Sequence, residues 1–274
     1  MRSASAFAKI NLAHVVGARR DGKHRVATVL QLIDLHDTIG IEAANALVVE
    51  GFDEDTIVRD ALESLGRAAG CEPCWRVRIE KRIPVAAGLG GGSSDAATAL
   101  SLANDSLDEP LVPGELHVVA ARVGADVPFF LAGGAQLGTG DGTALERLEL
   151  PSDYSVVLVV PTGVTKTSTG DVYRAFDARG GADGFPAREA ALANALAAVT
   201  TPRDLAIFPH NDLASSPLAK ELEAAGAFRA DVTGAGPTVY GLFEEHATAM
   251  RAADAFSDVG ESFVVRPLEA ADRS

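Results

Sequence analysis

The stretch that decides the fold is Pro84-Val85-Ala86-Ala87-Gly88-Leu89-Gly90-Gly91-Gly92-Ser93-Ser94-Asp95-Ala96-Ala97. It follows an alternating apolar and charged run at residues 75–80, typical of a half-buried strand, and precedes an apolar segment with helical spacing at 93–103. Glycine permits positive φ and lets a ligand approach the backbone. Exposed N–H groups at a helix start favour an anion. The stretch therefore predicts a phosphate-binding loop at residues 84–94 that holds a nucleotide.

The loop differs from the common nucleotide motifs. No Gly-Lys-Ser/Thr sequence ends it, and a dinucleotide-binding glycine frame that starts at Gly88 meets Ser93 in place of its last glycine. The signature set of protein kinases is also absent. These differences disfavour an NAD-dependent oxidoreductase. The alternative interpretation is a tight strand-to-helix turn in which Ser93 or Ser94 caps the helix.

Length and charge limit the function classes. The chain has 274 residues, which corresponds to about two domains at roughly 150 residues each. Lys and Arg number 24 and Asp and Glu number 38, so the net charge is −14. This charge disfavours nucleic-acid and anionic-membrane partners.

The sequence has no apolar run of membrane-spanning length and no signal-peptide pattern, so we expect a cytoplasmic protein. Cys71 and Cys74 form one isolated pair, expected to be reduced, and we predict no metal-ligand residues.

Hydrophobic patterning predicts helices and strands in both halves of the chain. The predicted helices lie at 54–70, 93–103, 114–122, 187–199 and 216–225, and the predicted strands at 75–80, 153–161 and 238–243. Residues 178–186 are rich in turn formers and are predicted to form a loop. We therefore expect an α+β protein with domains at 1–150 and 151–274.

Several separated segments carry a family resemblance. They are Ala8-Lys9-Ile10-Asn11-Leu12, Asp21-Gly22 followed by His24, the loop itself, Gly124-Ala125-Asp126-Val127-Pro128-Phe129-Phe130, Asn211-Asp212-Leu213 and Thr233-Gly234-Ala235-Gly236-Pro237-Thr238. Together they resemble the GHMP kinase superfamily, named for galactokinase, homoserine kinase, mevalonate kinase and phosphomevalonate kinase. The similarity is strongest to the branch that acts on 4-diphosphocytidyl-2-C-methyl-D-erythritol.

The resemblance implies both a fold and a reaction. The fold is a two-domain GHMP kinase fold, with an N-terminal ATP-binding domain like ribosomal protein S5 domain 2 and a C-terminal ferredoxin-like substrate domain. The reaction is phosphoryl transfer from ATP, with Mg²⁺, to the 2-hydroxyl of that small-molecule substrate, a step toward isoprenoid precursors outside the mevalonate route. We expect a monomer or a homodimer.

By motif match, Asp126 is the catalytic aspartate and Lys9 the catalytic lysine. Phosphoryl transfer requires a proton acceptor and a positive charge, which an aspartate and a lysine can supply. A carboxylate can accept the proton of the acceptor hydroxyl. An ammonium can keep a carboxylate ionised and can stabilise negative charge that develops during transfer. Without the resemblance, the aspartate would be read as a turn former and the lysine as a solvated side chain.

The predicted substrate-binding residues are Asn11, Lys23, His24, Tyr173, Thr233, Gly234 and Gly236. Asn11 lies two residues after Lys9, so in a strand both side chains point the same way. Where the family has Tyr-His after Asp-Gly, this chain has Lys23-His24. A lysine cannot stack on cytosine as an aromatic ring does. Tyr173 stands where relatives place a second aromatic, so the resemblance implies that it holds the base. Each of these residues also has a structural interpretation, as a strand-end contact, a turn former or a packing residue.

Two alternatives remain open from the sequence. Lys23 leaves room for a GHMP-type kinase that acts on a different alcohol. A nucleotide-binding relative without catalysis is the second, although the presence of both Lys9 and Asp126 argues against it.

Overall fold

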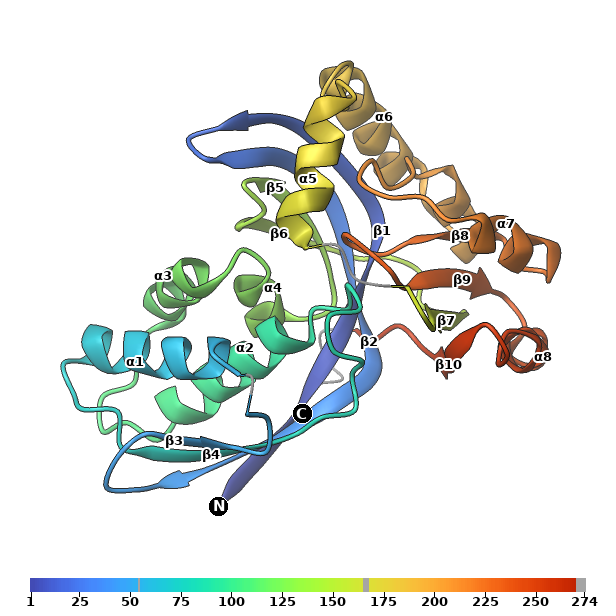
Figure 1. Cartoon of the computed structure of the whole chain (residues 1–274). Coiled ribbons are helices and arrows are strands. Elements are labelled where there is room, and N and C mark those ends of the chain that lie inside the picture. Colours follow the sequence, from blue (N-terminus) through green and yellow to red (C-terminus); the bar gives the residue numbers. More distant parts are fainter. Residues whose placement is uncertain (54, 165–167, 270–274) are drawn as a thin grey trace. The chain divides into compact units, whose positions relative to one another are not determined.

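The structure is a computed structural model that describes residues 1–53, 55–164 and 168–269 (Figure 1). The chain folds into two compact units. The first unit contains Met1–Ala8, Leu35–Val85 and Gly90–Ala132, and the second contains Lys9–Asp34, Ala86–Leu89 and Gly133–Ser274. The units interleave along the sequence. The predicted domains 1–150 and 151–274 stay a prediction.

The elements in chain order are β1 (Arg2–Arg20), β2 (Lys23–Ala43), β3 (Val48–Glu50), α1 (Ile57–Ala69), β4 (Trp75–Glu80), α2 (Gly91–Asn104), α3 (Pro113–Val123), α4 (Val127–Ala132), β5 (Ala135–Gly140), β6 (Ala144–Leu148), β7 (Ser155–Pro161), α5 (Thr169–Ala178), α6 (Phe185–Ala198), the short 3₁₀ helix η1 (Pro202–Ile207), α7 (Pro217–Ala224), β8 (Arg229–Val232), β9 (Val239–Phe243), α8 (His246–Ala255) and β10 (Gly260–Val265). The predicted helices and strands are present, with ends shifted by a few residues. The predicted helix start at residue 54 lies outside the described residues.

A long hairpin of β1 and β2 opens the chain, and it was not predicted. Its turn is Asp21-Gly22, with φ of 51° and 86°. Positive φ at both central turn residues matches the twist of a two-residue hairpin. Residues 8–17 of β1 are all buried. Because a strand buried on both faces lacks polar alternation, its periodicity gives no strand signal.

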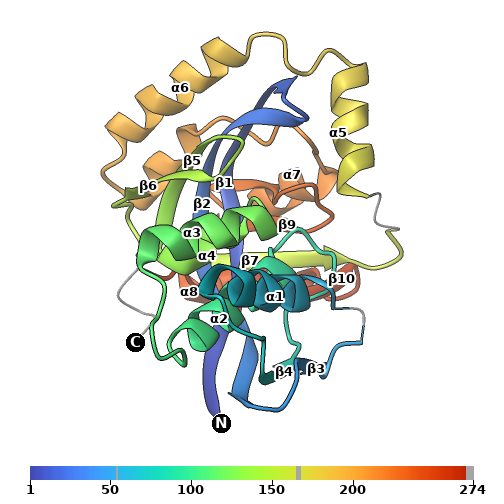
Figure 2. The ribbon, with the colours of Figure 1, turned by 90° about the vertical axis from the view of Figure 1, so that its left-hand side faces the viewer.

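The first unit packs helices with a small sheet (Figure 2). In it, Thr38–Ala43 of β2 pairs antiparallel with β4, and β3 pairs parallel with β4. Helix α1 buries Val58, Ala61, Leu62 and Leu65, an apolar stripe of helical period, and packs against α2. The helix ends at Gly70, which has the left-handed conformation expected of a C-terminal glycine. Helix α2 also packs against α4, so the helix that follows the glycine-rich loop contacts two other helices.

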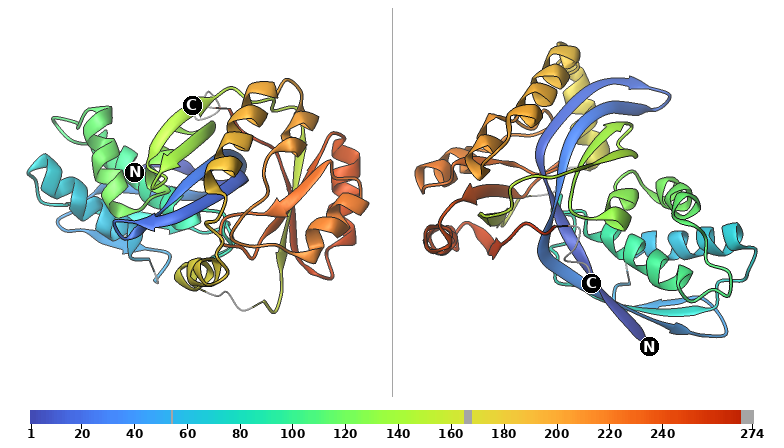
Figure 3. Two further views of the ribbon diagram at one scale, coloured as in Figure 1. Left: turned by 90° about the horizontal axis from the view of Figure 1, so that it is seen from above. Right: turned by 180° about the vertical axis from the view of Figure 1, so that it is seen from behind.

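The second unit contains two antiparallel arrangements. In one, Val26–Gln31 of β2 pairs with β5, which pairs with β6. The other is a four-stranded sheet of order β10-β7-β9-β8. Helices α7 and α8 contribute to one core with this sheet and lie on the same side of it (Figure 3). The order strand, helices, strand, strand, helix, strand is the ferredoxin-like pattern expected for the C-terminal part.

Candidate active site

The backbone of the glycine-rich loop explains its composition. Gly88 and Gly90 have φ of 85° and 74°, and Ala86 also has positive φ, at 61°. A Cβ atom on Gly88 would lie 2.5 Å from the carbonyl oxygen of Thr233, which is too close for any side chain. The peptide groups of this loop segment pack on the turn at residues 233–238, since Thr238 N donates to Ala87 O at 3.3 Å. Glycine is therefore required at position 88 for both conformation and space.

The start of α2 differs from the prediction. The helix begins at Gly91, its N-cap is Gly90, and no side chain caps it. The alternative role of Ser93 and Ser94 as caps is therefore wrong, and Asp95 falls beyond the first turn. Ser94 N donates to Gly90 O at 2.9 Å, so the N–H groups of residues 91–93 have no acceptor within the helix.

A phosphate group fits this helix start. The hydroxyl oxygen of Ser94 is buried and has no hydrogen-bond partner among the described residues. Buried polar atoms normally have a partner, so such an atom beside unpaired helix N–H groups suits a bound polar ligand. The residues present therefore fit the anionic part of a nucleotide.

A buried cluster of charges supports the same helix, and the sequence reading missed it. Lys81 Nζ lies 2.8 Å from Asp95 Oδ2 and also contacts the Asp37 carboxylate. Asp37 is fully buried and also accepts the backbone N–H of Ile83 at 2.8 Å. Burial, opposed by the charge of Lys81 and assisted by the like charge of Asp37, raises the pKa of Asp95 to about 7. Burial lowers the pKa of Lys81, but Asp95 and Asp37 outweigh this and the net shift is upward.

Asp126 lies in the turn before α4 and is half-buried. Helix α4 holds this turn in place, because Val127, Phe129 and Phe130 are fully buried and α4 packs on α2 and α3. The carboxylate of Asp126 is thus carried at the start of a short, firmly packed helix. Sequence reasoning identified this aspartate through the resemblance alone.

Lys9, Asn11 and Thr233 form a hydrogen-bonded set in the second unit. Lys9 Nζ donates to Asn11 Oδ1 at 2.6 Å, which confirms the expectation that the two side chains of β1 share a direction. The Thr233 hydroxyl accepts from Asn11 N at 3.1 Å and donates to Asn11 Oδ1 at 3.2 Å. Lys9 N donates to Leu89 O at 3.0 Å, so β1 also contacts the glycine-rich loop. Three segments far apart in sequence meet here.

Two further polar residues join this set without having been predicted. Asn11 Nδ2 donates to the Thr28 hydroxyl at 2.9 Å, and His14 Nδ1 lies 3.0 Å from that hydroxyl. Both Thr28 and His14 are buried. Neither residue stood out in the sequence as a candidate for the site. His14 lies in the continuously buried part of β1, and Thr28 lies within β2. Their contacts orient the Asn11 amide.

The candidate substrate residues Lys23, His24 and Tyr173 have well-defined partners. Lys23 Nζ lies 2.6 Å from Asp141 Oδ2, and its hydrogen bond lowers the pKa of Asp141 to about 2. The His24 ring is stacked on Tyr173, with 4.6 Å between ring centroids. His24 Nε2 lies 2.8 Å from Asp177 Oδ1. The structure therefore brings His24 and Tyr173 together and shows Lys23 bound to the β5–β6 turn.

No cluster of three or more His, Cys, Asp or Glu side chains suited to a metal occurs in the described part of the chain. Cys71 and Cys74 are both exposed free cysteines. Among residues 1–53, 55–164 and 168–269, none of the helices is both long enough and apolar enough to cross a membrane.

Comparison with known proteins gives consistent matches. The model of the GHMP kinases N terminal domain matches residues 55–134, and that of the GHMP kinases C terminal domain matches residues 214–262. The 4-diphosphocytidyl-2-C-methyl-D-erythritol kinase of Pelotomaculum thermopropionicum is 38% identical, over 96% of each chain. The protein of the same name from Chlorobium phaeobacteroides is 34% identical, over 93% of this chain and 94% of its own.

A solved structure agrees with these relatives. The crystal structure of a 4-(cytidine 5'-diphospho)-2C-methyl-D-erythritol kinase superposes with a TM-score of 0.78 at 29% identity, over 97% of this chain and 99% of the other. The predicted two-domain α+β fold of the GHMP kinases is thereby confirmed. The chain belongs to the GHMP kinase family and, within it, to the 4-diphosphocytidyl-2-C-methyl-D-erythritol kinases.

Proposed function

We propose that the protein transfers the γ-phosphoryl group of ATP to the 2-hydroxyl of 4-diphosphocytidyl-2-C-methyl-D-erythritol. The observation that carries the proposal is the glycine-rich loop that leads into α2, in a chain similar over nearly its whole length to proteins named for this activity. The unpaired N–H groups at the start of α2 and the buried Ser94 hydroxyl support a phosphate ligand there.

Residues 84–94 would hold the ATP phosphates. Backbone N–H groups suit this role because they bring no counter-charge of their own, and the helix N-terminus favours negative charge. Mg²⁺, when bound with ATP, neutralises charge on the phosphates. Magnesium usually keeps several waters and takes only one or two carboxylates besides phosphate oxygens, so it requires no dedicated cluster of protein ligands.

Asp126 and Lys9 would act on the transferring group. The acceptor oxygen forms a bond to the γ-phosphorus, the bond from that phosphorus to the bridging oxygen breaks, and the electron pair leaves with ADP. Asp126 accepts the proton that the acceptor hydroxyl releases. The ammonium of Lys9 stabilises negative charge on the equatorial oxygens. Asn11 and Thr233, which contact Lys9 directly or through each other, would orient the acceptor.

His24 and Tyr173 would bind the cytidine end, with Lys23 beside the substrate phosphates. The stacking of Tyr173 on His24 supports a preformed aromatic surface for the base. The bond from His24 Nε2 to Asp177 supports a fixed ring orientation, in which the imidazole would take part in recognising the base. Gly234 and Gly236, both with positive φ, would let the acceptor approach the turn backbone.

The second candidate is a kinase for a different alcohol, which Lys23 favours because that position lacks the aromatic ring of the family. Purified protein, ATP and a panel of alcohols distinguish the two. The first proposal expects ADP formation with the cytidyl substrate and little with mevalonate or homoserine. The opposite pattern would reject it. The cytoplasmic location, the absence of nucleic-acid and membrane partners, and the monomeric or homodimeric state stay predictions.

A further inference from the structure

We propose that Asn211 is a positioning residue that fixes the Lys9–Asn11 pair through the turn at residues 233–236. The inference rests on the proposed function, since it takes Lys9 as the residue that acts on the phosphoryl group. It gives a role to the segment Asn211-Asp212-Leu213, which the sequence singled out and the proposed mechanism does not use.

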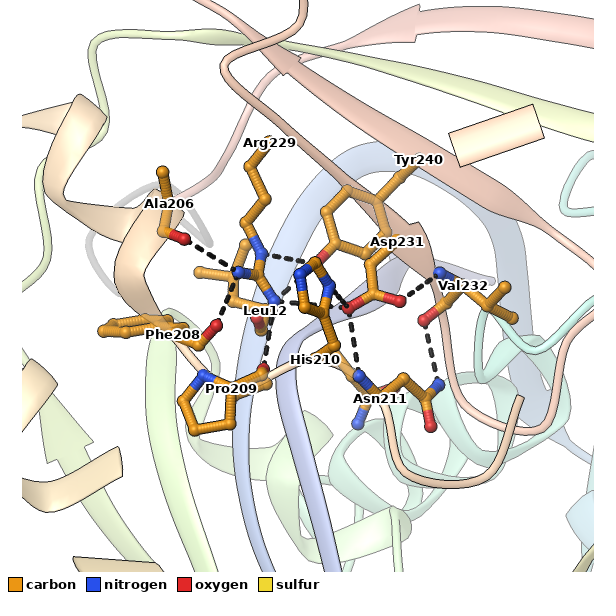
Figure 4. A network of polar contacts seen from close by, with 12 residues as sticks. Leu12, Ala206, Phe208, Pro209, His210, Asn211, Arg229, Asp231, Val232 and Tyr240 are labelled. Carbon is orange, nitrogen blue, oxygen red and sulfur yellow. Dashed lines mark hydrogen bonds and ion pairs between the residues drawn. The ribbon is translucent and has the colours of Figure 1, made fainter. Parts of the chain in front are cut away.

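The anchor of this arrangement is a buried ion pair (Figure 4). Arg229 is 2% exposed, and its guanidinium lies 3.2 Å from Asp231 Oδ2. The same guanidinium donates to the carbonyl oxygens of Phe208 at 2.7 Å and Pro209 at 3.0 Å. A buried pair of charges is stable only when its hydrogen bonds are satisfied, and such a network has few alternative arrangements. It ties the segment before Asn211 to β8.

Asn211 connects this anchor to the turn (Figure 4). Its backbone N–H donates to Asp231 Oδ2 at 3.0 Å, and its Oδ1 accepts from Leu213 N at 2.8 Å. Its Nδ2 donates to the carbonyl oxygens of Val232 at 2.9 Å and Gly234 at 2.7 Å. Two carbonyl acceptors require the amide nitrogen on that side, so the network fixes the orientation of the side chain.

The turn at residues 233–236 contacts Lys9 and Asn11. Gly234 has φ of 57°, and a Cβ atom on it would lie 3.3 Å from Lys9 Nζ. The fully buried Thr233 donates its hydroxyl proton to Asn11 Oδ1, the oxygen that also accepts from Lys9 Nζ. A path thus runs from Arg229 and Asp231 to Asn211, through the backbone of the turn to Thr233, and through Asn11 to the lysine.

Loss of the two Asn211 donors would let the turn shift and would move the Lys9 ammonium. A misplacement of about 1 Å in a reacting geometry can cost about 10²-fold in rate. The N–H groups at the start of α2 belong to residues 91–93, beyond the part of the loop that packs on this turn, so nucleotide binding should change less than the transfer step. Asn211 should therefore affect kcat more than KM.

The test compares Asn211→Ala with Asn104→Ala. Asn104 is a control of the same residue type, because its side chain is buried and likewise bridges backbone groups, donating to Leu111 O at 3.1 Å and accepting from Leu111 N at 2.8 Å. Both variants should lose similar thermal stability. We expect kcat to fall by about 10- to 100-fold only for Asn211→Ala, with KM for ATP within about threefold of wild type.

A second variant guards against unfolding. Asn211→Asp keeps the acceptor for Leu213 N and loses both donors, so it should reproduce the fall in kcat while the protein stays folded by circular dichroism. Equal kcat for the Asn211 and Asn104 variants, a change confined to KM, or unfolding of both Asn211 variants would overturn the inference. Failure of the wild-type protein to phosphorylate the cytidyl substrate would instead reject the proposed function.

Discussion

The substitution Asp95→Asn should change how folding stability depends on pH. In the wild-type protein, burial raises the pKa of Asp95 from 3.8 to about 7, and the like charge of Asp37 contributes while Lys81 opposes. The folded protein therefore binds a proton at Asp95 that the unfolded chain has already released between about pH 4 and 7. Stability contributed by that proton is fully present at low pH and is lost as pH rises through this window.

The size of the effect follows from the number of protons. One proton held by the folded state alone changes the free energy of unfolding by about 1.4 kcal/mol per pH unit. Asparagine resembles the protonated acid and cannot titrate, so the variant should lack this slope. We expect the stability of Asp95→Asn relative to wild type to increase from pH 5 to 7.

Urea unfolding at pH 5, 6, 7 and 8 measures this difference. Other charged groups at the cluster are Lys81 and Asp37, with Asp55 near Lys81; all remain in both proteins. Asp141→Asn serves as a control, because the pKa of Asp141 is lowered to about 2 and the group does not titrate in this range. Parallel stability curves for wild type and Asp95→Asn would refute the assignment of the raised pKa to this carboxylate.

Two other substitutions test the loop and the substrate end. Gly88→Ala should lower the melting temperature and nearly abolish turnover, because its Cβ atom would meet Thr233 O at 2.5 Å; calorimetry and an ADP-release assay check this, and wild-type values would contradict it. Lys23→Tyr should lower KM for the cytidyl substrate, since stacking on a base contributes about 1–3 kcal/mol. The exposed pair that it breaks with Asp141 should cost less than about 1 kcal/mol in urea unfolding. An unchanged or higher KM would show that Lys23 makes a contact that the ring cannot replace.

Local patterns were enough to predict most helices and, in the four-stranded sheet, strands β7 and β9 but not β8 and β10. The alternation in β4 matches its burial, in which every second side chain points inward. The hairpin of β1 and β2 was not predicted, because residues 8–17 of β1 are all buried and lack the alternation of a half-buried strand. The Asp21-Gly22 turn, with positive φ at both positions, was the available signal for it.

The candidate site was predictable only in part. Lys9 and Asn11 could be paired from strand geometry, and their hydrogen bond confirms that pairing. The contacts of Lys81 with Asp37 and Asp95 join residues distant in sequence. A local sequence pattern cannot predict these contacts, because the three side chains come together only in the folded protein. The predicted start of α2 at residue 93 was two residues too late, because the N-cap is Gly90 and not a serine.

The most direct test is phosphorylation of 4-diphosphocytidyl-2-C-methyl-D-erythritol by wild type and by Asp126→Asn. Wild type should form product only when ATP is present. The variant should have a kcat lower by about 10²–10⁴-fold, the usual contribution of a positioned general base. An Asp126→Asn protein as fast as wild type would contradict the proposed mechanism, and a wild-type protein inactive on this substrate would contradict the proposed function.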